Sequence, residues 1–451
     1  MSAAGTPRVS MPSRRSFFLL GAGAAGGLGL AAGAGAARAD VGEAARSGSR
    51  SVGSYDVAAS STSLDFSTRE AFEAVEDDLD GEPPLDTDNY GGMLGWQSSY
   101  VLQAQLQMYL AHRDVHFLDR FIERADAILA MRDSELDRTD YRGLSLAGWP
   151  RVWSGFTEAV HTPVETGMIA RPMAWFARVV LETPELASDP HFSNRAEIYA
   201  QASVDALDIH EEQWEELPDG GGIYSFTKGS AYPYDGIECA YNMNHTLGST
   251  ALHLAALTGE QSYADKVRRM CRLLASDLDP APGGAYIWSY QWTGSWGYRG
   301  WSPEDEVSEN TPEHQPGNTR PEDFSHGALS MEFIAAAQQE GLAFTGRDVR
   351  AFAHTFNNAL VETDYGLDVT EFLDGTGGVR EGGRDAAAAG AWACLHRYNR
   401  DIIPVTQTLY DQFAFTTQPS RTVTILCGIS ELNRAAARGR PHPGGPFPPR
   451  S

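Results

Sequence analysis

The amino-acid sequence predicts an all-α fold, an (α/α) toroid of helical hairpins with long aromatic-rich loops on one rim. Apolar residues recur at intervals of three and four along successive segments, which is the period of an amphipathic helix. The segments come in pairs joined by short polar breaks, and strong strand alternation is absent. One hairpin cannot bury its own apolar face, so neighbouring hairpins must stack. We therefore expect an incomplete or complete six-hairpin barrel.

The elements follow in order along the chain. A single helix is expected over residues 66–80, and hairpins over residues 96–130, 165–209, 244–274 and 325–360. Residues 384–399 and 420–436 are expected to form the two helices of a fifth hairpin, connected by residues 401–417. The polar break after Leu110 matches the break after Leu257, and each is followed by an aromatic residue, Phe117 or Tyr263. This match aligns the starts of the first helices of the hairpins.

Residues 1–39 are interpreted as a twin-arginine signal peptide. Arg14 and Arg15 stand between serines and before a short, glycine-rich apolar run, and Ala37-Arg38-Ala39 has the pattern of a cleavage site. The alternative is a chance arginine pair before a membrane anchor, although the run suits export better than spanning. We expect a flexible linker over residues 40–63, a catalytic domain over 64–437 and a disordered tail over 438–451. The twin-arginine export machinery is then a partner, and the mature protein is secreted or periplasmic and leaves the membrane after cleavage.

Charge and cysteine content exclude some classes of function. The 451-residue chain has a formal net charge of −25, and the signal peptide carries four Arg and no acid, which puts the mature chain near −25 − 4 = −29. Such a balance argues against nucleic acid and anionic membranes as partners. The four cysteines form no C-x-x-C pair, and an exported protein permits one disulfide.

No cofactor and no metal is expected. Asp86, Asp88 and Gly91 have the spacing that begins a calcium loop, but Gln97 stands where a bidentate Glu is wanted, so a capped turn is favoured. His245, His326, Asp323 and Glu322 could hold a metal ion, yet no His-x-x-His or paired-Cys spacing supports one.

Polar residues are expected to meet at one rim of the toroid. The aligned helix starts are Ser98-Ser99, Thr166-Gly167, Asn244-His245 and Ser325-His326. Tight turns close the other end, so the long loops rich in Trp and Tyr lie on the same rim as these starts. Helix N-termini also present free N–H groups there. Plain N-capping is the alternative role for each Ser, Thr or Asn, and a lone histidine at a helix start is more often structural than catalytic.

Asn244-His245, the run Glu322–Gly327 and the repeated hairpins resemble the secreted α/α-toroid carbohydrate-active enzymes over about residues 90–435. That group includes uronate-polysaccharide lyases, glucuronyl C5-epimerases and several glycoside hydrolases. The resemblance implies that Asn244 neutralises a uronate carboxylate and that His245 or His326 takes the α-proton. A tyrosine then protonates the leaving oxygen. Tyr241 is the nearest candidate for that tyrosine, with Tyr234, Tyr290 and Tyr298 as alternatives.

The substrate is expected to be a polysaccharide or oligosaccharide, cleaved by β-elimination at a uronic acid. The residues predicted to bind it are Trp96, Gln97, Trp153, Arg171, Tyr234, Trp288, Trp292, Trp296, Tyr298 and Arg299. One alternative is a glycoside hydrolase of the same fold that uses paired carboxylates. Its candidates are Glu165, Glu322 and Asp323 at helix starts, with Asp235 and Glu238 in a loop, although acids in first turns also stabilise helices through the dipole alone. A second alternative is a non-catalytic secreted glycan-binding protein.

Overall fold

The computed structural model describes residues 64–79, 81–413 and 419–438. These residues belong to one compact unit, residues 51–451. The predicted signal peptide, the linker over 40–63 and residues 439–451 of the predicted tail lie outside the described residues, so those three expectations stay predictions.

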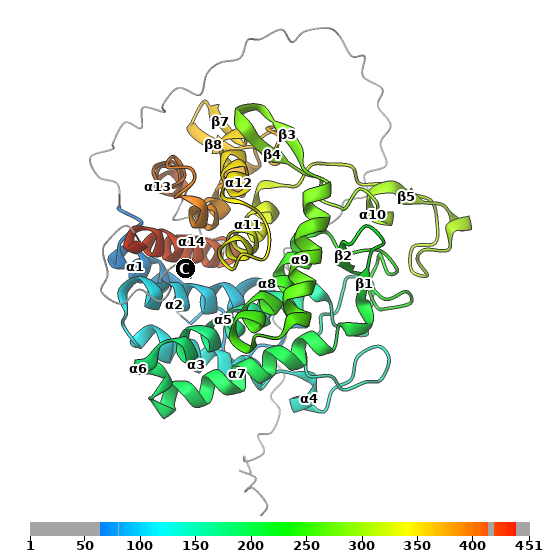
Figure 1. Ribbon diagram of the computed structural model, residues 1–451, viewed down its shortest axis with the longest axis horizontal. Helices are drawn as coiled ribbons and strands as arrows, with labels where there is room; N and C mark the ends of the chain where they lie inside the picture. Colours follow the sequence, from blue (N-terminus) through cyan, green and yellow to red (C-terminus); the bar gives the residue numbers. More distant parts are fainter. Residues whose placement is uncertain (1–63, 80, 414–418, 439–451) are drawn as a thin grey trace, which may run out of the picture. The chain divides into compact units, whose positions relative to one another are not determined.

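By their contacts, six helical segments of the described residues form a closed inner ring, and most of them are labelled in Figure 1. They are α2 (Ser99–His112), α5 (Pro163–Glu182), α8 (Tyr241–Thr258), α11 (Phe324–Gln339), the 3₁₀ segment η6 (Ala386–Leu395) and α14 (Pro419–Arg438). Each segment packs against the next, and α14 returns to α2. The ring is therefore complete, and the predicted all-α toroid is confirmed.

A second helix packs on the outside of each inner one. The outer helices are α3 (His116–Leu129), α7 (Pro190–Asp208), α9 (Gln261–Ser276), α12 (Gly346–Asn358), α13 (Ile402–Phe413) and α1 (Arg69–Leu79). The sixth pair joins the two ends of the domain, because α1 packs against α14. The Asn433 amide donates to Thr68 O at 3.0 Å across this junction.

The fifth hairpin differs from the prediction. Residues 402–413 are not a connector but the outer helix α13, which packs on η6, and the helix predicted over 420–436 is α14, the partner of α1. Ile402, Val405 and Leu409 are buried at helical spacing, so the apolar period was present in a segment interpreted as a loop. Gly390 of η6 and Gly428 of α14 let these two segments touch, since a Cβ at Gly390 would lie 2.3 Å from the Gly428 Cα.

The loops between these helices contain short strands and short helical turns. The strands form four antiparallel two-stranded ladders: β1 (Trp214–Glu216) with β2 (Gly222–Tyr224), β3 (Asp279–Ala281) with β4 (Ala285–Ile287), β5 (Gly300–Trp301) with β6 (Gln315–Pro316), and β7 (Leu360–Thr363) with β8 (Gly366–Val369). The short helical turns are η1 (Leu94–Ser98, a π-helix), α4 (Asp133–Leu136), α6 (Pro184–Ala187), η2 (Glu211–Gln213), η3 (Pro282–Gly284), α10 (Trp296–Arg299), η4 (Pro303–Asp305) and η5 (Glu381–Gly383).

Differences in burial explain why the helical period is clearer in the sequences of the outer helices than in those of the inner ones. Outer helix α3 buries one face, with Phe117, Phe121 and Ile128 inward, as an amphipathic helix does. Inner helix α5 is instead buried on every side from Pro163 to Val180. Among the described helices, none is both long enough and apolar enough to cross a membrane.

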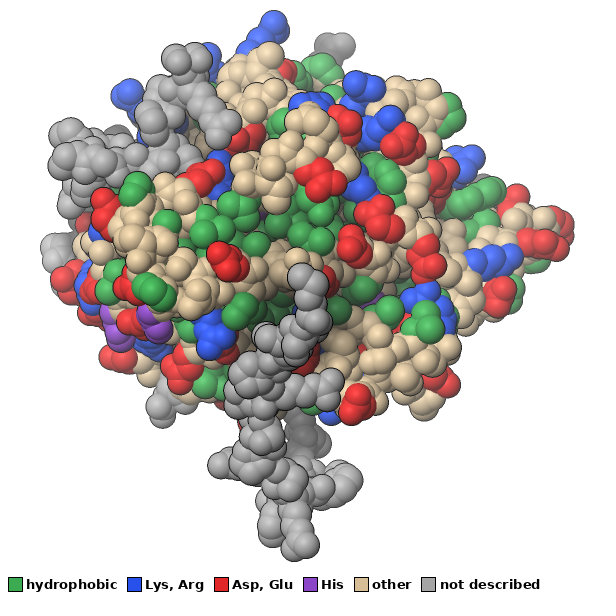
Figure 2. Space-filling model, turned by 60° about the horizontal axis from the view of Figure 1, so that its bottom comes forward, with side chains coloured by type: hydrophobic (Ala, Val, Ile, Leu, Met, Phe, Trp, Pro, Cys, Tyr) green, Lys and Arg blue, Asp and Glu red, His purple; other side chains and the backbone are tan. Residues whose placement is uncertain are grey.

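The loop before α8 and the loop before α11 fold against each other. Asp235, fully buried, accepts backbone N–H groups of Glu309 at 3.1 Å and Asn310 at 3.0 Å. The Asn310 amide donates in return to Ser230 O at 2.6 Å. Residues 280–320 are therefore attached to the loop before α8 by several hydrogen bonds. On the face drawn in Figure 2, acidic and basic side chains are interspersed around a patch of hydrophobic ones.

Candidate functional site

The starts of the inner helices meet at one end of the ring, as predicted. The Trp96 indole, just before α2, donates to Glu165 Oε1 in the first turn of α5 at 2.7 Å. The Asn242 amide in the first turn of α8 lies 3.4 Å from Glu322 Oε2, which is next to the N-cap of α11. Because these contacts join successive helix starts, side chains from distant parts of the sequence share one rim.

Five residues at the α8 and α11 starts form what we call the reactive cluster: Asn242, Tyr290, Glu322, Asp323 and His326. Four come from helix starts, and Tyr290 comes from the loop that follows β4. The Tyr290 ring centroid lies 5.6 Å from that of His326. Tyr290 O accepts the N–H of Tyr241 at 3.3 Å, which ties the loop to the start of α8.

Asp323 holds His326 in place. As the N-cap of α11, its Oδ1 accepts the backbone N–H groups of Ser325 at 3.1 Å and His326 at 3.0 Å. Its other oxygen, Oδ2, contacts His326 Nδ1. Burial alone would raise the pKa of Asp323, but the neighbouring imidazole and these donors hold that pKa below its ordinary value. A carboxylate at Nδ1 keeps the hydrogen there and leaves the lone pair of a neutral ring on Nε2.

The pKa of Glu322 is shifted in the opposite direction to that of Asp323. The Glu322 side chain is fully buried, and burial raises its pKa well above the ordinary value, with the charge of Asp323 adding to the effect. Its Oε1 accepts the N–H of Asp323 at 3.1 Å. The pKa values of two adjacent carboxyl groups are therefore shifted in opposite directions, that of Glu322 upward by burial and that of Asp323 downward by its donors.

Tyr290 is half-buried beside both acids. Burial raises its pKa well above the ordinary value, and the charges of Glu322 and Asp323 act in the same direction. The side chain of Asn242 hydrogen-bonds to it. Its hydroxyl therefore keeps its proton at neutral pH and can donate that proton to a bound group.

Two arginines border the cluster and differ in their partners. Arg380 contacts Asp385, lies 3.7 Å from Glu371 and lies 3.9 Å from Asp323, so three acids surround one guanidinium. Arg320 is exposed, has its guanidinium 5.6 Å from the Phe372 ring centroid, and accepts the N–H of Tyr290 at its carbonyl. Arg380 is thus committed to protein carboxylates, whereas Arg320 has no ion pair within the described part of the chain.

An apolar floor lies beside the cluster on the inner faces of the helices. Its buried members are Val164, Met168 and Leu329, with Trp96, Tyr100 and Met243 packed against them. Leu329 follows His326 by one helical turn, and Met243 follows Asn242 directly. The floor is therefore next to the cluster along both α8 and α11.

Glu165 organises a second group of residues, which we call the Glu165 cluster: Asn89, Trp96, Arg151 and Glu165. Glu165 is fully buried at the start of α5. Its Oε1 accepts from the Trp96 indole at 2.7 Å and from Arg151 at 2.8 Å, and its Oε2 accepts from the Asn89 amide at 3.2 Å. The carboxylate predicted as a catalytic candidate is thus saturated with donors from its own chain.

Three predicted catalytic residues lie away from the rim. His245 is fully buried, because α8 begins at Tyr241 and its second turn faces α11. The His245 ring lies between those of Tyr241 and Phe333. Its Nδ1 hydrogen-bonds to Ser330 Oγ at 2.8 Å. Asn244 caps the N–H of Tyr224 at 2.8 Å. The Tyr241 hydroxyl donates to Asp277 at 2.8 Å. The structure gives all three a place in the packing of α8, so the expected equivalence of His245 and His326 was wrong.

Two predicted substrate-binding residues are also interior. Arg171 is 2% exposed, contacts Gln103 and has Glu332 at 3.5 Å. Trp288 is 1% exposed and packs edge-on against Phe352. Neither side chain is open to a glycan at the rim.

The remaining predicted substrate-binding residues keep at least part of their surface accessible. These are Trp96, Gln97, Trp153, Tyr234, Trp292, Trp296, Tyr298 and Arg299. The Arg299 guanidinium lies 4.6 Å from the Trp296 ring centroid, and Trp153 packs edge-on against Tyr232 at 4.9 Å. Substrate contact by any of them stays a prediction.

Glu322, Asp323 and His326 are also the residues that could hold a cation, with ligand atoms within 4.8 Å of one another. Their oxygens, however, already accept hydrogen bonds from Asn242, Ser325 and the backbone. At the predicted capped turn, Asp88 accepts the N–H of Tyr90 at 3.1 Å and pairs with Arg138 at 3.0 Å. These contacts agree with a capped turn, and the expectation of no metal there stays a prediction.

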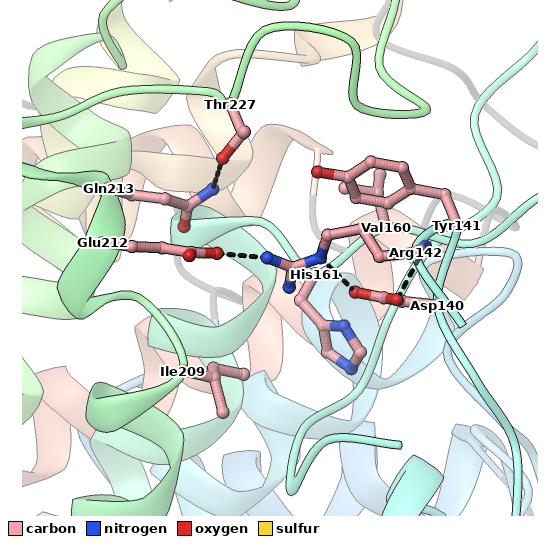
Figure 3. A pocket seen from close by; sticks show the side chains of 9 residues that line it. All are labelled: Asp140, Tyr141, Arg142, Val160, His161, Ile209, Glu212, Gln213 and Thr227. Carbon is pink, nitrogen blue, oxygen red and sulfur yellow. Dashed lines mark hydrogen bonds and ion pairs between the residues drawn. The ribbon is translucent and has the colours of Figure 1, made fainter. Parts of the chain in front are cut away.

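A small pocket lies elsewhere, between the loop 137–161 and the segment after α7 (Figure 3). Arg142 spans it, bonding Asp140 at 3.0 Å and contacting Glu212, while Gln213 reaches Thr227 at 3.4 Å. Burial lowers the pKa of His161, on its wall, to about 4. The pocket contains none of the predicted site residues, and its own ion pairs occupy it.

No protein-family model matches this chain, and no curated protein matches it. Several solved structures are similar to this chain at low identity. An inactive variant of the α-1,6-mannanase GH76A of Salegentibacter sp. HEL1_6, in complex with α-1,6-mannotriose, is 10% identical, with 83% of this chain and 99% of that chain covered and a TM-score of 0.45. An unsaturated glucuronyl hydrolase from Streptococcus agalactiae is 13% identical over 84% and 93%, TM-score 0.45. A D-mannose isomerase is 13% identical over 77% and 86%, TM-score 0.45.

Proposed function

We propose that this chain is a carbohydrate-active enzyme that cleaves a polysaccharide or oligosaccharide by β-elimination at a uronic acid. One observation carries the proposal: Asp323 holds His326 by Nδ1 while the Tyr290 ring lies 5.6 Å away. A base and a proton donor therefore stand next to each other at the rim. The Asn, His and Tyr types expected from the resemblance are all present, supplied by Asn242, His326 and Tyr290.

The reaction uses one proton acceptor and one proton donor. Nε2 of His326 takes the proton from C5 of the uronate, α to its carboxyl group, and the C5–H electron pair forms the C4=C5 double bond. The C4–O bond breaks, and its oxygen receives the proton of the Tyr290 hydroxyl. General acid–base groups of this kind contribute about 10²–10⁴-fold to a rate. Asp323 stabilises the imidazolium that forms at His326.

Asn242 and Glu322 are suited to the uronate carboxylate. Abstraction of the C5 proton builds negative charge on that carboxyl group, so donors must face it. The Asn242 amide donates toward Glu322 Oε2 at 3.4 Å, and because both side chains are buried, the uronate carboxylate reaches them only after a local opening of the rim. An ionised acid at position 322 would repel the substrate, which gives the raised pKa of Glu322 a function.

The test follows two products at once. The protein is incubated with acidic and neutral glycans while ultraviolet absorbance from the new double bond and new reducing ends are recorded. Elimination predicts that both signals rise together on a uronate-containing glycan and that His326→Ala abolishes both. Reducing ends without absorbance would overturn elimination, and neither signal on any glycan would overturn cleavage altogether.

Hydrolysis is the second candidate, and the adjacent Glu322 and Asp323 carboxyl groups, whose pKa values shift in opposite directions, favour it. A glycosidase needs one protonated and one ionised carboxyl group near the bond. Glu322 and Asp323 meet the protonation requirement, since their pKa values move in opposite directions. Asp323, however, is already engaged by Ser325 and His326, which leaves elimination as the stronger proposal.

We further propose export by the twin-arginine route. Arg14 and Arg15 within residues 1–39 support it. Changing both to Lys is expected to retain the full-length precursor inside the producing cell, whereas the native sequence delivers a shortened protein outside the cytoplasm. Equal export of both forms would overturn this route.

A further inference from the structure

Trp96 and Arg151 flank the reactive cluster and are fixed by one buried carboxylate. Trp96 packs against the apolar floor, whose member Leu329 lies one helical turn beyond His326. On the other side, Trp153 packs edge-on against Tyr232 at 4.9 Å, and Tyr232 is close enough to Tyr290 to affect its pKa. The Glu165 cluster is therefore continuous with the site of the proposed reaction without containing its reacting groups.

Both carboxylate oxygens of Glu165 already accept hydrogen bonds, which suits a residue that positions its neighbours and not one that reacts with substrate. The Trp96 indole and Arg151 donate to one oxygen and Asn89 to the other. The side chain is fully buried, so no substrate oxygen can reach it without displacing these donors. A buried acid with three donors fixes the rotamers of its partners, which here are an indole and a guanidinium.

Arg151 keeps hydrogen-bonding capacity beyond Glu165. Within the described part of the chain Glu165 is its one ion-pair partner, reached through one guanidinium nitrogen. The guanidinium also lies 4.3 Å from the Trp153 ring centroid, and its side chain is 15% exposed. The planar fork of an arginine binds carboxylates in a paired geometry, so the edge not facing Glu165 is positioned to do the same.

The backbone at Gly92 is shaped around this pair. Gly92 has φ +80°, and a Cβ there would lie 3.1 Å from the Arg151 Cζ and 3.2 Å from the Trp96 Cδ1. A side chain at position 92 would therefore press on both groups. Glu165 thus bonds both Arg151 and Trp96, and Gly92 lies close to both because it has no side chain.

We propose that Trp96, Arg151 and Trp153 form a subsite for a second acidic sugar of the substrate, and that Glu165 is a positioning residue and not a catalytic one. The aromatic faces stack on the pyranose ring, and Arg151 pairs with its carboxylate. The inference rests on the proposed function only in taking a uronate-containing glycan as the ligand. It requires at least two adjacent acidic residues in the chain that binds.

Binding is measured by calorimetry in a His326→Ala background, so that no turnover occurs. The probes are tetrasaccharides of mannuronate, guluronate, glucuronate and galacturonate, each beside its carboxyl-reduced neutral counterpart. Arg151→Gln is expected to weaken binding of the preferred acidic tetrasaccharide by about tenfold or more and to leave the neutral one nearly unchanged. Arg151→Lys, which keeps the charge without the fork, is expected to lose less.

Two further variants separate the positioning of Arg151 by Glu165 from a general effect on folding. Glu165→Gln is expected to weaken acidic-tetrasaccharide binding in the same direction, and its effect should not add to that of Arg151→Gln, because both act through one guanidinium. Arg195→Gln is the matched control, since it removes an arginine from the 3.0 Å ion pair with Asp126 on outer helices. It should leave binding unchanged.

The outcomes distinguish this inference from the proposed function. If absorbance appears on uronates but Arg151→Gln binds the acidic and neutral forms like its parent, the subsite is wrong and elimination stands. If no absorbance appears but acidic binding depends on Arg151, the subsite stands and elimination is wrong. Additive losses from Glu165→Gln and Arg151→Gln would overturn the positioning role of Glu165.

Discussion

Asp323 caps α11 with one oxygen and holds His326 Nδ1 with the other, so one carboxylate fixes both the start of the helix and the tautomer of its third residue. These two tasks can be separated by mutation. An asparagine keeps an oxygen for the backbone N–H groups but cannot supply a negative charge to an imidazolium.

The first prediction follows from that separation. Asp323→Asn is expected to fold with nearly unchanged thermal stability, because the cap is kept, and to lose about 10²-fold or more in kcat, because His326 is no longer held as the base. Parallel measurements of melting temperature and turnover check it. A variant that loses stability and activity in proportion would indicate that capping is the main role of Asp323.

The second prediction concerns Tyr290. Tyr290→Phe removes the proposed proton donor and leaves the ring against His326, so kcat should fall by about 10²–10⁴-fold with the fold retained. Substrates with a good leaving group at C4 need no proton and should recover much of the rate. Equal losses on both kinds of substrate would exclude Tyr290 as the acid.

The third prediction is a pH dependence of stability at Glu322. Its pKa is raised in the folded protein, so its contribution is fully present below the unfolded pKa near 4.5 and is lost as pH rises through the raised folded pKa. Glu322→Gln cannot ionise. Its stability relative to the native protein should therefore increase from pH 4.5 upward, as measured by urea unfolding at a series of pH values. A constant difference across pH would contradict burial of a neutral Glu322.

The fold could be predicted from the sequence further than the site could. Amphipathic outer helices such as α9 show a clear period, since Tyr263, Val267 and Leu274 line one face. Segment η6 shows none, because its Ala-rich stretch is buried on nearly every side. The prediction of a helix over residues 384–399 covers η6, whereas the prediction of a connector over 401–417 misses α13, although Ile402 and Leu409 have a helical spacing.

For the site, the sequence predicts the types of residue correctly but not the direction in which each side chain points around its helix. Asn242 and Asn244 stand two positions apart, which turns them about 200° around α8. One consequently faces Glu322 and the other the N–H of Tyr224. A motif in the sequence locates a helix start to within a residue or two, and that error is enough to exchange a rim residue for an interior one. Tyr290 carried no local signal beyond the aromatic content of its loop.

The fourth prediction contrasts the two histidines that the sequence treated as equivalent. His245 is buried between Tyr241 and Phe333, and burial lowers its pKa to about 3. His245→Ala leaves a cavity of aromatic size and should cost about 3–5 kcal/mol of unfolding free energy. Per folded molecule its turnover should persist, whereas His326→Ala should keep stability and lose turnover. Unfolding curves and active-site titration on the two variants separate the cases.

The same burial gives His245 an acid-sensitive role in stability. Its folded pKa lies below the unfolded value of 6.5, so its contribution is present above pH 6.5 and is lost as pH falls toward about 3. His245→Gln, which cannot take up a proton there, should flatten this part of the stability profile, while His326→Gln serves as the matched control at the rim. If His245→Gln leaves the acid limb as steep as in the native protein, then other buried groups, such as His210 with its pKa lowered to about 3 by burial, dominate the acid unfolding.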